Sequence, residues 1–240
     1  VDGTSYTTTY SNFDTYGNPG TIVESGPNGG NRTTTRTYLN DTAKWIIGRL
    51  KDESFTGSFT TRLFDANGNL TSINRDGVTT SHTYDSQGNV ATTTQPRGLL
   101  YTYSNYKRGI PQTEAQPEGV TITRVVDYMG NITSETNGEG HTTAYTYDGL
   151  NRVTSVDYPF GTTKTIAYTA TSQTATRQDL VETIQFDGFA RPSSITLGGI
   201  TTTFTHDPLG RMTFESHPGS SSGTSYLYDT LNRITRINNA

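Results

Sequence analysis

Eight aspartates of this 240-residue sequence occupy the same place in a recurring motif, and carboxylates are side chains that can do chemistry. The motif is an aromatic residue, Asp, two variable residues, Gly (or Asn or Ala), and then Asn or Arg. Two carboxylates that face one bond could act as the general acid and base of a glycosidase. Six to eight converging oxygens could bind calcium. The eight are Asp14, Asp65, Asp85, Asp127, Asp148, Asp187, Asp207 and Asp229.

The spacing of these aspartates indicates a structural role. Neighbouring copies lie 20 to 22 residues apart or about twice that, except for the first interval of 51 residues. Such a period is typical of tandem repeats, in which equivalent residues form a row along the stack. A row does not bring two or more carboxylates to one pocket or ion. We therefore predict that the aspartates cap the backbone, with no catalytic role and no metal.

Each motif reads as a type I turn. Asp at the first position accepts hydrogen bonds from backbone N–H groups, and Gly three residues later adopts a positive φ. Asn151 and Asn232 occupy that position in two copies, and Asn also tolerates this backbone region. The predicted turn glycines are Gly17, Gly68, Gly88, Gly130 and Gly210.

The other residues that could do chemistry form no recognisable site. His82, His141, His206 and His217 lack the spacing of metal ligands, and His82 and His206 stand where other copies have Tyr or Phe. The sequence has no phosphate-binding loop of the P-loop kind. We predict that the chain is not an enzyme and needs no cofactor.

The residues between the turns predict short strands. Aromatic residues alternate before the turns, as in Tyr145-x-Tyr147 and Tyr226-x-Tyr228, which indicates a strand with one aromatic face. A second turn signal, such as Arg75-Asp76-Gly77, lies between successive motifs. Each unit of about 20 residues is thus one β-hairpin. Stacked hairpins predict an all-β, antiparallel meander of about twenty strands, which must curve because large sheets twist.

The aromatic residues allow a second interpretation. Tyr145, Tyr147, Tyr226 and Tyr228 could form a face on which sugar rings stack, although cross-strand packing that fixes the register is the interpretation we favour. Trp45 is the sole Trp and precedes two isoleucines. We expect it to plug or anchor an irregular segment, and contact with a ligand is the alternative. The sequence divides into this irregular part, residues 1–60, and the regular repeats of residues 61–240, which continue it.

The composition fits an ordered sheet with much solvated surface. Hydrophobic residues make up only 30% of the chain, yet the net charge is −4, aromatic residues reach 10%, and Thr accounts for 48 residues. Disordered chains combine low hydrophobicity with high net charge and few aromatic or β-branched residues. The acidic balance argues against nucleic acid, and no apolar stretch approaches the ~20 residues that span a bilayer. The chain has no Cys, which excludes disulfides and thiolate zinc sites.

The repeats resemble the RHS/YD-repeat family, which includes bacterial polymorphic toxins, subunits of insecticidal toxin complexes and the animal teneurins. The likeness is close over residues 142–156 and 204–212. It implies a ribbon that spirals into a hollow shell, in bacteria a secreted or cell-surface structure that encloses or delivers a toxic C-terminal polypeptide. The chain would then be a slice of this scaffold, with the rest of its parent protein and the cargo as partners. The alternative function is an extracellular module that binds carbohydrate or a cell surface. Self-association through open sheet edges is also expected.

Overall fold

The computed structural model describes residues 5–27 and 30–239. Over this part the chain forms 22 β-strands and three short 3-10 helices, so the predicted all-β antiparallel meander is confirmed. The chain divides into two compact units, Val1–Thr123 and Arg124–Ala240. No helix of the described ranges is long and apolar enough to cross a membrane.

In unit 1 each strand pairs antiparallel with the next one along the chain. The 3-10 helices η1 (Thr42–Lys44), η2 (Pro96–Gly98) and η3 (Pro117–Gly119) lie between strands. The strands are β1 (Thr7–Phe13), β2 (Pro19–Ser25), β3 (Asn31–Asp41), β4 (Ile46–Phe55), β5 (Ser58–Phe64), β6 (Leu70–Arg75), β7 (Val78–Tyr84), β8 (Val90–Gln95), β9 (Leu99–Lys107), β10 (Ile110–Ala115) and β11 (Thr121–Val126), which crosses the boundary of the units.

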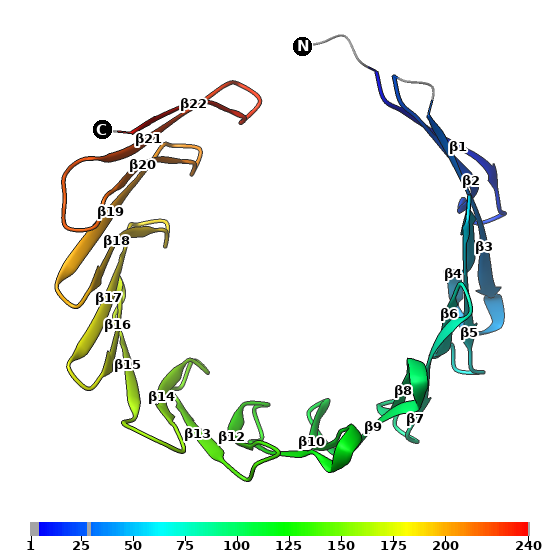
Figure 1. Ribbon diagram of the computed structural model, residues 1–240, viewed down its shortest axis with the longest axis horizontal. Helices are drawn as coiled ribbons and strands as arrows, with labels where there is room; N and C mark the ends of the chain where they lie inside the picture. Colours follow the sequence, from blue (N-terminus) through cyan, green and yellow to red (C-terminus); the bar gives the residue numbers. More distant parts are fainter. Residues whose placement is uncertain (1–4, 28–29, 240) are drawn as a thin grey trace. The chain divides into compact units, whose positions relative to one another are not determined.

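Unit 2 repeats the same plan. Its strands are β12 (Ile132–Thr136), β13 (Thr142–Tyr147), β14 (Val153–Asp157), β15 (Lys164–Tyr168), β16 (Ser172–Arg177), β17 (Leu180–Phe186), β18 (Pro192–Leu197), β19 (Ile200–His206), β20 (Met212–Ser216), β21 (Gly223–Tyr228) and β22 (Ile234–Asn239). In Figure 1 these strands follow one another in chain order along a bent path.

Residues 5–27 and 30–60 also form paired strands. β3 and β4 have 11 and 10 residues, and the register between them shifts twice before η1. The sequence boundary at residue 60 stays a prediction. The boundary of the compact units, between Thr123 and Arg124, is a different one.

Turns of different kinds occupy the two edges of the meander. One edge carries the Asp turns. At the other edge, tight turns such as that between β6 and β7 place two successive residues at positive φ, 52° for Asp76 and 86° for Gly77. Two such residues form a type I′ turn, whose twist matches that of the paired strands.

A β-bulge recurs beside the Asp turns. The pairing shifts by one residue just before the aromatic position of the motif, for example between Thr146 and Tyr147. The extra residue, Thr154, accepts or donates a hydrogen bond of 2.8 Å with the hydroxyl of Thr146. Bulges bend a strand and increase its twist. A bulge at the same place in β5–β6, β7–β8, β17–β18, β19–β20 and β21–β22 therefore gives a physical cause for the bend within each unit.

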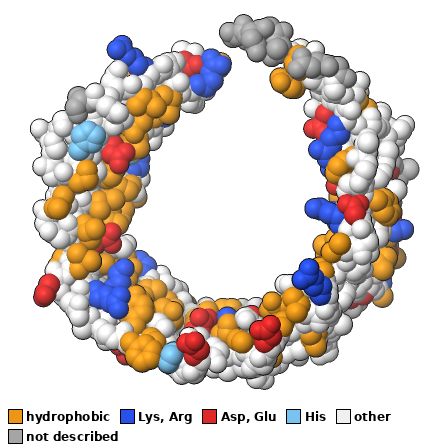
Figure 2. All heavy atoms as spheres, viewed as in Figure 1, with side chains coloured by type: hydrophobic (Ala, Val, Ile, Leu, Met, Phe, Trp, Pro, Cys, Tyr) orange, Lys and Arg blue, Asp and Glu red, His pale blue; other side chains and the backbone are white. Residues whose placement is uncertain are grey.

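The sheet has almost no core. In the described residues the buried hydrophobic side chains are Ile22, Val126 and Ala175. Most strand residues are half-buried, because each face of a single layer is covered only by its own side chains. The two faces differ: Ile184 opposes Ile195 on one, and threonines oppose each other on the other. In Figure 2 hydrophobic side chains gather on the inward-curving side of unit 2.

Candidate functional site

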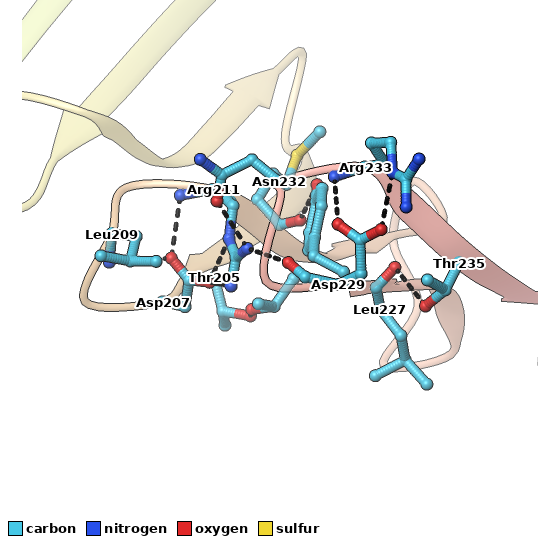
Figure 3. Close-up of polar contacts among 12 residues, drawn as sticks. Thr205, Asp207, Leu209, Arg211, Leu227, Asp229, Asn232, Arg233 and Thr235 are labelled. Carbon is cyan, nitrogen blue, oxygen red and sulfur yellow. Dashed lines mark hydrogen bonds and ion pairs between the residues drawn. The ribbon is translucent and has the colours of Figure 1, made fainter.

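The Asp turns hold the aspartates in one hydrogen-bond pattern, which Asp207 illustrates (Figure 3). Its Oδ1 accepts hydrogen bonds of 3.0 Å from the backbone N–H groups of Leu209 and Arg211. Its Oδ2 accepts one of 2.7 Å from Nε of Arg211. The N–H of Gly210 donates to the carbonyl of Asp207 at 2.9 Å, and φ of Gly210 is +84°. The side chain is thus fully engaged inside its own turn.

All eight aspartates make these contacts. In every copy Oδ1 accepts from the backbone N–H groups two and four residues later. The fourth residue binds the other oxygen and is Asn in the first four copies and Arg in the last four. The position before it has a positive φ throughout, and the residues there are Gly17, Gly68, Gly88, Gly130, Asn151, Ala190, Gly210 and Asn232.

These hydrogen bonds keep the carboxylates ionised. The side chain of Asn18 lowers the pKa of Asp14 to about 2, against the opposing effect of burial. The side chain of Arg191 lowers the pKa of Asp187 to about 2 in the same way. The pKa values of the other six turn aspartates are lowered as well. A carboxylate that stays ionised and has both oxygens occupied is a poor general acid.

Within each unit the aspartates are strung out along one edge of the sheet, which we name the aspartate edge. Successive Asp turns of a unit are separated by two strands or by four, so that even the nearest copies of the motif lie roughly 10 Å apart. Within residues 5–27 and 30–239, no three His, Asp or Glu side chains form a group that could hold a metal ion. The arrangement does not bring the predicted site residues together.

The residue that binds the carboxylate also reaches the next repeat. Nη1 of Arg211 donates to the carbonyl of Asp229 at 3.2 Å and to Oδ1 of Asn232 at 2.9 Å (Figure 3). The same guanidinium lies 4.6 Å from the ring centroid of Tyr228. Arg152 lies likewise over Tyr168, at 4.2 Å. Arg211 therefore couples two consecutive hairpins through hydrogen bonds and a cation–π contact, and Arg152 does so through the cation–π contact.

A second row of contacts runs beside the first, and we name it the tyrosine ladder. Six tyrosine hydroxyls donate to a backbone carbonyl of the preceding hairpin at 2.6 to 3.0 Å. Every acceptor lies five residues after an aspartate of the motif, as Ile132 does after Asp127. The donors are Tyr38, Tyr84, Tyr106, Tyr147, Tyr168 and Tyr228.

The tyrosines predicted as a possible sugar-binding face are half-buried in the sheet. Tyr147 and Tyr228 use their hydroxyls in the tyrosine ladder, and Arg211 covers one face of Tyr228. Tyr145 and Tyr226 lie on the same strands two residues earlier. Burial raises the pKa of Tyr145 and Tyr147. These contacts favour cross-strand packing over an open stacking surface.

The prediction that Trp45 plugs or anchors its segment is wrong in this structure. Its side chain is 89% exposed and packs against no core. The residue ends η1 with a left-handed backbone, φ 56°, and its N–H donates to the carbonyl of Thr42. The left-handed conformation turns the chain into β4 and leaves the indole in solvent.

The histidines lie apart. Nδ1 of His82 is 3.0 Å from the hydroxyl of Thr93 on the neighbouring strand. Nδ1 of His141 lies 3.3 Å from Oε2 of Glu139. The His141 ring also packs edge to face against Phe160, with 4.6 Å between the ring centroids. These contacts belong to hairpin packing.

Motif reasoning missed part of the tyrosine ladder. Tyr38 and Tyr106 belong to the ladder but do not precede Asp, so the motif does not identify them. A signal was available, because Tyr106 precedes Lys107 at the position of the missing aspartate, and an Arg-Gly pair follows.

The geometry defines a class of protein: a tandem β-hairpin repeat with aspartate-capped turns, in which tyrosines and several arginines contact the neighbouring hairpin. The family model for the RHS Repeat matches residues 64–100 and 127–163. These two segments are RHS repeats, as the sequence resemblance indicated.

Solved structures of toxin complexes share the fold. The crystal structure of TcdB2-TccC3-Cdc42 superposes with a TM-score of 0.60 over 97% of this chain, at 13% identity. The structure of the Photorhabdus luminescens Tc holotoxin pore superposes with a TM-score of 0.58 over 95% of this chain, also at 13% identity. The crystal structure of TcdB2-TccC3 without its hypervariable C-terminal region superposes with a TM-score of 0.59 over 97% of this chain, at 14% identity. The chain spans 15% of the length of each of these structures. Comparison with curated proteins gave no match.

Proposed function

We propose that this chain is a segment of the wall of an RHS shell, which in a longer bacterial protein encloses or delivers a toxic C-terminal polypeptide. The observation that carries the proposal is the match of nearly the whole chain to a small part of much larger toxin-complex structures. The wall would contact the remainder of its parent protein and its cargo, in a secreted or cell-surface setting.

The internal contacts support a wall. A sheet that is one layer thick buries little apolar surface, and this chain buries three hydrophobic side chains in its described part. The tyrosine ladder and the contacts of Arg211 instead connect hairpins to their neighbours. Such nearest-neighbour stabilisation lets a repeat protein extend without a central core. Enclosing a cargo needs a continuous surface of this kind and needs no reaction.

Limited proteolysis of the full-length gene product that contains this chain tests the proposal. The segment that follows the repeats should resist trypsin in native buffer and become sensitive when the repeats are unfolded by urea. A double variant, Asp148→Ala with Asp187→Ala, should loosen the wall and shorten the protection. Digestion of that segment at the same rate with and without urea would contradict enclosure.

One observation favours the alternative, a module that binds carbohydrate or a cell surface. Trp45 presents an exposed indole, and aromatic rings of this kind stack on sugars. A glycan array of the chain tests this role, with Trp45→Ala as the matched variant. Binding that Trp45→Ala abolishes would support the module, whereas a blank array would leave the shell as the sole proposal.

A further inference from the structure

A hollow of about 310 Å³ lies on the apolar face of unit 2, over strands β15 to β18. A row of paired residues crosses these strands: Ile166, Ala175, Glu182 and Leu197. Ala175 is buried and has the shortest side chain of the row, so that space remains above it. Glu182 lies two residues before Ile184 on β17, so the row is on the face whose hydrophobic side chains gather on the inward-curving side (Figure 2).

The loop between β14 and β15 forms one wall of the hollow. This loop has six residues, 158–163, whereas the turn between β18 and β19 has only Gly198 and Gly199. Tyr158 of the loop lines the hollow, and the guanidinium of Arg177 on β16 lies 4.4 Å from the centroid of the Tyr158 ring. The longer connection thus brings an aromatic ring against a cation at the rim.

The guanidinium of Arg177 is held in place with donors to spare. Its Nε donates to the carbonyl of Thr162 at 3.3 Å, and its plane is supported by the Tyr158 ring. Nη1 and Nη2 have no hydrogen-bond acceptor among the described residues. A guanidinium fixed in this way is preorganised for a carboxylate, which it binds through parallel N–H···O bonds.

Two further charged side chains line the hollow, Lys164 of β15 and Glu182 of β17. Both are half-buried, and neither takes part in an ion pair or a side-chain hydrogen bond in the described part of the chain. Together with Arg177 the lining has two cations and one carboxylate, a net charge of +1. A charge that is partly removed from water without a partner favours a ligand that supplies one.

The remaining walls are apolar. Leu180 and Leu197 line the hollow, and both are exposed. Apolar walls with a few charged groups are the usual make-up of a ligand pocket, and the volume lies at the lower end of the range for such pockets. The hollow therefore admits a short piece of extended chain and excludes a folded domain.

We propose that this hollow binds an acidic side chain of the polypeptide that the shell encloses. The carboxylate of that side chain lies between Lys164 and Arg177, and Glu182 accepts a hydrogen bond from a backbone N–H of the same segment. Leu180 and Leu197 contact an apolar residue beside the acidic one. The inference rests on the proposed function for the source of the polypeptide, and it adds the chemistry by which the wall recognises it.

The aromatic lining favours a polypeptide over a sugar. A sugar ring stacks on an open aromatic face. The guanidinium of Arg177 covers one face of Tyr158, the aromatic residue that lines the hollow. The leucines offer contacts to an aliphatic side chain instead.

Photo-cross-linking in the full-length gene product tests which segment occupies the hollow. A photoreactive benzoylphenylalanine replaces Leu197, and the cross-linked peptides are identified by mass spectrometry. The product should join position 197 to the segment that follows the repeats, with an Asp or Glu next to the linkage site. The same substitution at the exposed Val181, which precedes Glu182 and so points to the opposite face, should give no such product.

The charge requirement is tested with short peptides and the 240-residue chain. Fluorescence anisotropy measures the binding of fluorescein-labelled Gly-Leu-Glu-Leu-Gly and of its Gln counterpart. The Glu peptide should bind about tenfold more tightly, because only a carboxylate forms charge-assisted hydrogen bonds with the two cations. Lys164→Gln should remove most of this difference and Lys164→Arg should retain it. Lys51→Gln, the same change at an exposed lysine of β4, should leave the difference intact.

The outcomes separate this proposal from the shell itself. Equal affinities for the two peptides would overturn the proposed site. Cross-links confined to the repeats would do so too, if the segment after the repeats stays protected from trypsin, and the shell would stand. Loss of that protection would instead refute the shell.

Discussion

Removing a single hydroxyl from the tyrosine ladder is a stringent test of how the hairpins are joined. The hydroxyl of Tyr147 donates to the carbonyl of Ile132 at 2.7 Å in a half-buried site. A hydrogen bond of this kind contributes about 1 kcal/mol net. Tyr147→Phe keeps the ring and its packing, so we expect the free energy of unfolding to fall by about 1 kcal/mol.

A matched control lies in the same strand. Tyr145 is on the same face as Tyr147, two residues earlier, and its pKa is also raised by burial. Its hydroxyl has no role in the tyrosine ladder, so Tyr145→Phe should change stability by less than about 0.5 kcal/mol.

Urea unfolding followed by circular dichroism measures both variants. Tyr84→Phe in the other unit should cost as much as Tyr147→Phe, since it loses an equivalent bond of 2.7 Å to Leu70. Distant sites add, so the double variant Tyr84→Phe with Tyr147→Phe should lose about 2 kcal/mol. Equal costs for Tyr147→Phe and Tyr145→Phe, or no cost for either, would refute the ladder as a source of stability.

Three further predictions concern the aspartate edge. Gly88→Ala, at φ +85°, should cost about 1–2 kcal/mol, whereas Gly149→Ala in a turn position without positive φ should be near neutral in the same melts. The pKa of Asp14 falls from 3.8 in the unfolded chain to about 2 in the folded one. The ionised carboxylate therefore stabilises the fold at neutral pH, and this stabilisation is lost as the pH drops from about 4 towards 2. A thermal unfolding midpoint that stays constant between pH 4 and pH 2 would contradict this prediction. Arg211→Lys should cost about 1 kcal/mol, because Lys cannot reproduce the forked contacts to the next repeat, while the exposed Arg233→Lys should cost less than about 0.5 kcal/mol. Equal denaturation midpoints for these two arginine variants would argue against coupling between repeats.

The fold was predictable because its signals are local and repeated. Asp followed three residues later by Gly specifies a turn by itself, and its recurrence near every 20 residues predicts the stack of hairpins. The positive φ at Gly88, and at Asn151 where Asn replaces Gly, follows from the same pattern.

The contacts between hairpins were less predictable. They depend on which residues meet after pairing, and the bulge at Thr154 shifts that pairing by one residue. The hydrogen bond from Arg211 to the carbonyl of Asp229 joins residues that are 18 positions apart in the sequence. A local turn pattern does not predict a contact over this separation. The exposure of Trp45 was missed because hydrophobicity suggests burial, whereas a single-layer sheet gives an indole in a turn nothing to pack against.

The scarcity of buried apolar side chains has a thermal consequence. The heat capacity of a protein rises on unfolding mainly because nonpolar groups become hydrated. A single-layer sheet in which Ile22, Val126 and Ala175 are the buried hydrophobic residues of the described part exposes little new nonpolar surface when it melts. Its free energy of unfolding should therefore vary gently with temperature. Cooling should lower the stability of this sheet less than that of a globular protein of equal length with a large hydrophobic core.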